Sequence, residues 1–158
     1  MRSATKRQSV HFDPVIISEV INLSKNLRKH SDAKHSKTPR RNGVIRASDI
    51  PVYPADTKDE DVLAYRAAKD AFIEYLSGLS ITMVKDIMAL MYLGRNGCFD
   101  GICLVPVHKR LSIYENSHCF RDDEKDKMII HMAEKSRLLG EYLEDVLRFI
   151  NEPKCGKC

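Results

Sequence analysis

The chain lacks the features by which membrane, secreted and disulfide-rich proteins are recognised. No apolar run approaches the ~20 residues that a membrane-spanning helix needs, and no apolar signal segment follows the basic start Met1–Arg7. The five cysteines are odd in number and mostly scattered, which makes a poor disulfide framework and suits a reducing compartment. We therefore expect a cytoplasmic protein with no membrane partner.

The chain also lacks the short motifs of well-known active sites. It has no GxxxxGK(S/T) phosphate loop, no GxGxxG fingerprint, no GxSxG nucleophile elbow and no HExxH zinc motif. Gly94-Arg95-Asn96-Gly97 is too short for a nucleotide loop and follows a predicted helix, so we interpret it as a helix stop. We assign no catalytic and no cofactor-binding residue, and we expect a non-enzymatic protein.

What is present is the composition of one folded domain. The 158 residues suffice for a single core, and 43% of them are hydrophobic, the usual share in a globular chain. We expect a disordered tail over residues 1–12, a single helical domain over 13–152 and a cysteine-containing tail over 153–158.

The first helix is predicted at 13–30, where Asp13 is a suitable N-cap and Pro14 a suitable first helical residue. The following residues, 31–56, are mostly polar and contain several prolines, which disfavour a helix. Their composition offers little apolar area to offset the entropy of ordering. We therefore expect 31–56 to be a long mobile loop.

Two further helices are predicted in the middle of the chain. One runs over 57–77, with acidic residues at its start, and ends at Gly78. The next runs over 81–93, is capped by Ser80 and is apolar on most of its circumference. A helix of that kind must be surrounded by other parts of the fold.

The last predicted helical region, 122–151, carries a long apolar stripe that suits either one helix or two helices broken near Ser136. Residues 98–121 are compatible with a short strand or a short helix, because periodicity alone does not separate the two. The predicted fold class is all-α, a compact bundle of four to six helices with a long basic loop after the first helix.

Charge is distributed unevenly along the chain. Residues 1–46 hold 11 Lys or Arg against 3 Asp or Glu, whereas the whole chain has a net charge of only +4. Such asymmetry can mark a nucleic-acid-binding arm, but a solvated tail gives the same pattern and is the interpretation that we favour. The nucleic-acid hypothesis assigns phosphate contacts to five basic side chains: Lys34, Lys37, Arg40, Arg41 and Arg46.

The C-terminal Cys155-Gly156-Lys157-Cys158 is a CxxC pair, a spacing that lets two thiolates bind one zinc ion. A structural zinc site needs four ligands, and no second close pair is present to complete it. We therefore favour a structureless tail, with Cys155 and Cys158 as candidate metal ligands or a redox pair as the alternatives.

Two stretches resemble a known family once they are read together. Met88–Arg95 reads MALMYLGR and resembles the central "ALMxLGR" helix of an uncharacterised bacterial domain-of-unknown-function family. Leu138–Leu147 reads LLGEYLEDVL and resembles that family's C-terminal "LLxxYLExxL" helix. The resemblance covers roughly residues 62–151. It implies a helical fold and no assigned activity.

The sequence favours a small non-enzymatic helical interaction module that binds an as yet unidentified protein partner. One alternative is a nucleic-acid-associated accessory protein that uses the basic N-terminal third. The other is a zinc-binding or redox protein that uses the C-terminal cysteines. We also expect a homodimer, because the apolar third helix and the long C-terminal stripe offer more apolar surface than one small bundle readily covers.

Overall fold

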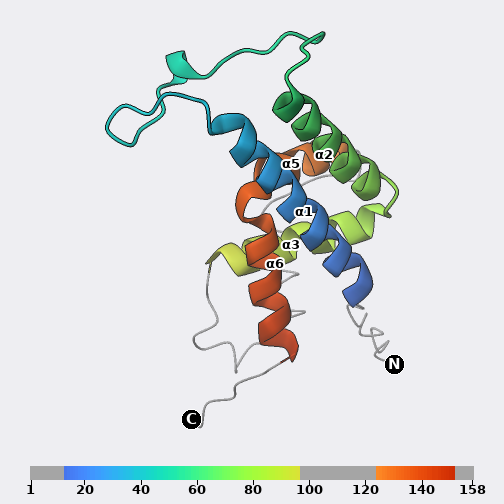
Figure 1. Ribbon diagram of the computed structural model, residues 1–158. Helices are drawn as coiled ribbons and strands as arrows, with labels where there is room; N and C mark the ends of the chain where they lie inside the picture. The colour runs from blue at the N-terminus through green and yellow to red at the C-terminus, as the bar shows by residue number, and fades with distance from the viewer. Residues whose placement is uncertain (1–12, 97–123, 152–158) are drawn as a thin grey trace, which may run out of the picture.

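The computed structural model describes residues 13–96 and 124–151, and these residues form a helical bundle (Figure 1). The predicted all-α class is confirmed. The described helices are, in chain order, α1 (Pro14–His35), the short 3-10 helix η1 (Ala47–Asp49), α2 (Glu60–Ser77), α3 (Ile81–Asn96), α5 (Lys125–Glu134) and α6 (Ser136–Asn151). None of these helices combines the length and apolarity needed to cross a membrane.

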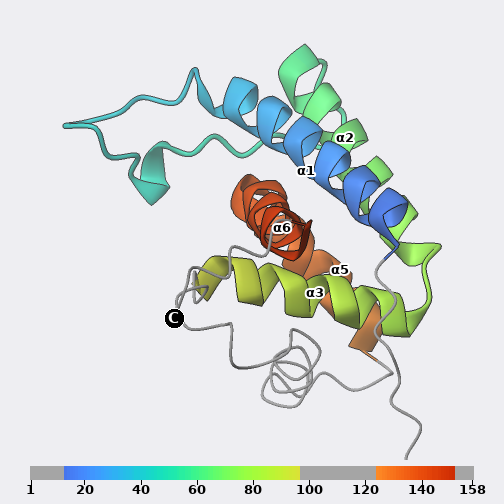
Figure 2. The same ribbon diagram turned by 90° about the horizontal axis from the view of Figure 1, so that it is seen from below.

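The helices are arranged around α6. Helices α1 and α2 lie side by side and antiparallel, and α1 covers one side of α6, while α3 crosses its other side (Figure 2). Helix α5 packs against both α2 and α3 and leads directly into α6. The core lies where these helices meet.

The apolar stripes predicted from the sequence form this core. Phe72 and Leu76 of α2 are fully buried, and so is Leu143 of α6. In α3 every residue from Ile87 to Gly94 is buried, in agreement with a helix that is apolar on most of its circumference. The homodimer prediction stays a prediction.

The capping residues act as the sequence predicts. The backbone N–H of Val15 donates to the Asp13 carboxylate at 2.9 Å, and the N–H of Met83 donates to the Ser80 hydroxyl at 3.2 Å. Helix α2 ends at Gly78. Its start differs from the prediction, because Asp59 accepts from the N–H groups of Asp61 and Val62 and so places the first turn at Glu60.

The C-terminal region forms two helices. Helix α5 ends at Glu134 and α6 begins at Ser136, with Lys135 between them. Of the two alternatives that the sequence left open, the structure therefore has the broken helix. The break lets Met132 of α5 and Leu139 of α6 both lie fully buried in one core.

The described part of α3 ends inside the predicted stop segment 94–97, but the predicted end at residue 93 is three residues too early and Gly94 itself is not the stop. Helix α3 continues through Gly94 and Arg95 to Asn96. Gly94 lies where α3 crosses α6, and a Cβ atom at this position would lie only 2.2 Å from the carbonyl oxygen of Tyr142. Glycine is required here by the close approach of two helices, and the two stretches that carry the family resemblance meet at this contact.

A second close contact joins α1 to α6. The buried Ser24 hydroxyl donates to the carbonyl oxygen of Ser136 at 2.8 Å and accepts from the N–H of Gly140 at 3.1 Å. One α1 side chain thus contacts both the carbonyl of residue i and the N–H of residue i+4 in the first turn of α6. Two ion pairs, Lys25–Glu144 and Arg28–Glu141, lie along the exposed border of the same contact.

The segment between α1 and α2 projects away from the bundle (Figure 1). Helix α1 runs to His35 and not to residue 30, so this segment begins at Ser36 and ends at Asp59. We call residues 36–59 the arm. The predicted mobility of this region stays a prediction, and the structure gives the arm a definite conformation that is described below.

Candidate nucleic-acid interface

The outer end of the arm is a tight hairpin turn. The N–H of Arg41 donates to the carbonyl of Val44 at 3.0 Å, and the N–H of Val44 donates to the carbonyl of Arg41 at 3.1 Å. Asn42 and Gly43 between them have φ values of 54° and 78°. Two consecutive positive φ values define the hairpin turn for which Asn-Gly is the preferred sequence. The chain therefore reverses direction sharply between two basic segments.

Three of the five predicted phosphate contacts lie at this outer end. Arg40, Arg41 and Arg46 are all exposed. In the ranges that the structure describes, none of the three forms an ion pair. Moreover, the sequence from Ser36 to Ser48 contains no Asp or Glu. Their charges are thus available to an external anion.

The other two predicted contacts, Lys34 and Lys37, belong to the base of the arm. Lys37 forms an ion pair with Asp61 of α2 at 3.1 Å. The hydrogen bond to Asp61, together with the negative charges of Asp59 and Asp61, raises the pKa of Lys37 above its usual value. The charge of this lysine already has a carboxylate partner within the protein.

Lys34 points between two aromatic rings. Its ammonium group lies 4.3 Å from the ring centre of Tyr65 on α2 and 5.9 Å from that of Tyr53 in the arm, within the range of cation–π attraction. Burial lowers the pKa of Lys34, and the nearby charges of Arg66 and Lys69 lower it further. Lys34 therefore links α1, the arm and α2, and its charge faces inward.

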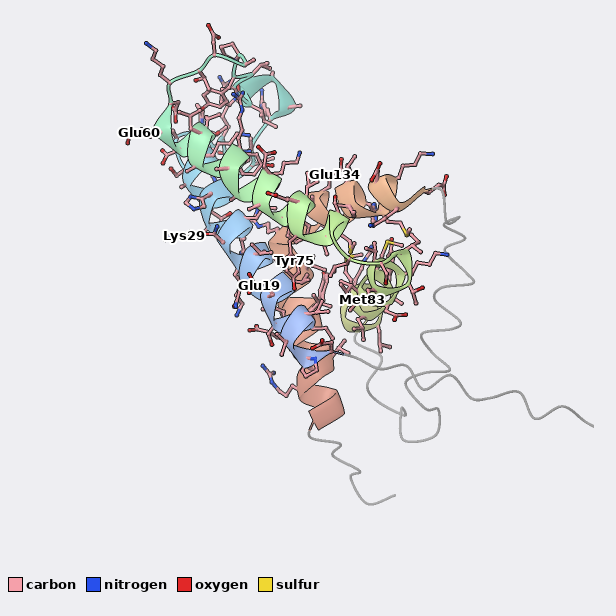
Figure 3. All side chains as sticks on the ribbon, turned by 90° about the vertical axis from the view of Figure 1, so that its right-hand side faces the viewer. Glu19, Lys29, Glu60, Tyr75, Met83 and Glu134 are labelled. Atoms are coloured by element: carbon pink, nitrogen blue, oxygen red, sulfur yellow. The ribbon has the colours of Figure 1, made fainter. Side chains whose placement is uncertain are left out.

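The strongest connection at the base of the arm comes from Arg66, a residue that the sequence did not single out. Its guanidinium group donates to three successive arm carbonyls, those of Tyr53 at 3.3 Å, Pro54 at 3.0 Å and Ala55 at 3.0 Å. The forked, planar donor geometry of arginine makes this triple contact feasible. Figure 3 shows the same end of the molecule, with Glu60 beside the arm and Met83 far from it.

The structure thus separates the five predicted basic residues into two groups. Lys34 and Lys37 fasten the arm to the bundle, whereas the three arginines are presented at its outer end. The sequence carried no signal for this division, because the partners Asp61 and Tyr65 lie on a different helix. Only the absence of acidic residues beside the arginines was visible in advance.

Other parts of the described structure offer less chemistry. A small groove between α1 and α3 is lined mainly by apolar side chains, with Asp13 and Asp86 as its carboxylates. His131 shares a 2.8 Å hydrogen bond between its Nε2 and the hydroxyl of Tyr92, at the edge of the core. Among residues 13–96 and 124–151, no three His, Cys, Asp or Glu side chains are grouped as metal ligands.

Some predictions concern residues outside the described ranges. The candidate zinc ligands Cys155 and Cys158 lie there, as do the tail 1–12 and the ambiguous segment 98–121.

The comparisons with known proteins leave the arm as the main guide to function. No family model, no curated protein and no solved structure matches the chain. The resemblance to a bacterial domain family accordingly stays a prediction.

Proposed function

We propose that this protein is a non-enzymatic interaction module whose partner is a nucleic acid, and that the arm makes the contact. The observation that carries the proposal is the group of three exposed, unneutralised arginines, Arg40, Arg41 and Arg46, around a hairpin turn that projects from the bundle. The helical bundle is the platform that holds the arm.

The chemistry of the outer arm supports a phosphate ligand. Arginine donates two parallel hydrogen bonds to phosphate oxygens and keeps its charge at any physiological pH. A projecting basic segment also reaches the nucleic-acid backbone ahead of the residues that follow Arg46, which are acidic on balance. Sequence-independent backbone binding is the activity that such an arm supplies.

Salt dependence is the direct test. The affinity for a fluorescently labelled nucleic acid is measured by anisotropy, and three arginine contacts predict a slope of about −2.7 for log affinity against log salt. The affinity then falls roughly 40-fold between about 50 and about 200 mM salt. Changing all three arginines to glutamine removes this slope.

The matched control removes the same charge from the bundle. Lys29, Lys135 and Arg137 are exposed residues away from the arm, and their triple change to glutamine should leave most of the slope in place. Equal losses in both triple variants would contradict a specific role for the arm. Binding to polyglutamate but not to nucleic acid would contradict the proposal and favour an acidic protein partner instead.

The homodimer, expected from the apolar third helix and the long C-terminal stripe, stays a separate proposal. Sedimentation velocity at micromolar concentration tests it. A dimer gives a species of twice the 18.1 kDa chain mass, and a single species at the chain mass would contradict it.

A further inference from the structure

We infer that the ligand of the arm is double-stranded DNA, contacted in its major groove by the hairpin turn. This inference depends on the proposed function and names the class of nucleic acid. It is based on the shape of the turn, the single aromatic residue of the arm, and the exposed apolar side chain beside the arginines.

The first argument is the shape of the turn. Arg41 and Val44 face each other across two reciprocal hydrogen bonds, so the arm ends in two chain segments joined by two residues. The turn is one bridged pair and not a pair of strands, and the major groove of B-form DNA, about 12 Å wide, has room for it because it admits a whole two-stranded ribbon. The major groove of an RNA duplex is deep and narrow and does not admit side chains in this way.

The second argument is the lack of a stacking surface. Proteins that bind single strands use aromatic side chains on which the bases stack. The arm sequence contains one aromatic residue, Tyr53. Tyr53 is half-buried, Lys34 lies against its ring and Arg66 binds its carbonyl. It therefore belongs to the base of the arm and is not presented to bases at the outer end.

The third argument is Val44. Its side chain is 63% exposed and projects from the same face of the hairpin as Arg41, because directly opposed residues share a face. An exposed valine beside two arginines suits a groove in which the arginines reach phosphates or base edges and the valine contacts thymine methyl groups. A single strand offers no such walled surface.

The test compares three probes of equal length: a DNA duplex, an RNA duplex and single-stranded DNA. We expect the DNA duplex to bind about tenfold more tightly than either alternative, the equivalent of one groove contact. The salt slope should be about −2.7 on the duplex and about −2.1 on the single strand. Equal or tighter binding of single-stranded DNA or of duplex RNA would overturn the inference and leave the proposed function standing. Failure of all three probes to bind would overturn the proposed function itself.

An uncharged variant separates the groove contact from charge. Val44→Ser removes both methyl groups without changing the charge, and we expect it to reduce the preference for duplex DNA severalfold with an unchanged salt slope. Val52→Ser is the matched control, because Val52 is 95% exposed in the arm but lies outside the hairpin. Equal effects of the two variants, or no effect of Val44→Ser, would contradict a groove contact at Val44.

Discussion

Gly94 is the single residue on which the crossing of α3 and α6 depends most visibly. Glycine inside a helix costs about 1 kcal/mol relative to alanine, so its presence needs a reason in packing. The reason is the Tyr142 backbone, which occupies the space that any Cβ atom at position 94 would need. The glycine therefore sets how closely the two helices approach.

The change Gly94→Ala should destabilise the protein by about 1–3 kcal/mol, since the two helices must separate to admit the methyl group. Urea unfolding measures the loss. Gly78→Ala is the control, because a Cβ atom there would meet its nearest neighbour at an ordinary 3.4 Å. It should change stability by less than about 0.5 kcal/mol. Equal effects of the two substitutions would refute the close-crossing account.

Lys34 and Lys37 differ in the direction in which their surroundings move the pKa. Burial and two neighbouring cations lower the pKa of Lys34, whereas the Asp61 hydrogen bond and nearby carboxylates raise that of Lys37. Through Lys34, the free energy of unfolding therefore increases as the pH rises from the folded pKa of this lysine to its unfolded value of 10.5. Lys37 contributes stability below its unfolded pKa and loses it as the pH rises through the higher folded value.

An NMR titration of the lysine side chains through the alkaline range tests the order in which Lys34 and Lys37 lose their protons. We expect Lys34 to lose its proton before Lys37, and we expect Asp61→Asn to bring Lys37 back toward 10.5 while Lys34 changes little. If Lys34 titrates together with Lys37 or after it, the described base of the arm is incorrect.

At the scale of elements, the arm is the part whose conformation depends on long-range contacts. Its first half turns back by local Asn-Gly chemistry, but its second half is fixed by hydrogen bonds from Arg66 on α2 to residues 53–55. A further bond, from the N–H of Thr57 to the carbonyl of Pro54 at 3.2 Å, closes a turn next to these residues. Loss of the Arg66 hydrogen bonds should therefore weaken the hydrogen bond that the Thr57 N–H donates.

We predict that Arg66→Gln speeds amide hydrogen exchange at Thr57 about tenfold, the equivalent of about 1.4 kcal/mol of lost local stability. Arg66→Lys keeps the charge but loses the forked donor, and it should give most of the same effect. Exchange at Thr57 that stays at the wild-type rate in both variants would show that the arm is held by something else. The same experiment tests the predicted mobility of residues 40–45.

At the scale of the whole molecule, local signals predicted the helices well. Caps such as Asp13 and Ser80, and apolar stripes at helical spacing, depend on neighbours in the sequence and are visible there. The extension of α1 to His35 was not predicted, because its last turns are polar and lack an apolar stripe. Gly94 was misread because a helix stop and a close helix crossing both favour glycine, and only the position of α6 separates them.

The candidate site was predicted in part for the same physical reason. The unbalanced positive charge of the arm is a property of composition, so all five basic residues were found. Which of these basic residues lack a partner within the protein depends on α2, the helix to which the arm is attached. Arg66 lies 11 residues along the chain from Ala55, whose carbonyl it binds. Asp61 lies on α2, at the other end of the arm sequence from its partner Lys37. Sequence spacing does not reveal contacts of this kind.

The central claim is that the outer arginines bind phosphate while the inner lysines only hold the arm. Two double variants with the same change in charge test it most directly, Arg40→Gln/Arg41→Gln and Lys34→Gln/Lys37→Gln. We measure the salt dependence of binding to duplex DNA for each. The arginine variant should lower the slope by about 1.8, and the lysine variant should leave it nearly unchanged. Equal slopes for the two variants, or a larger loss in the lysine variant, would contradict the account.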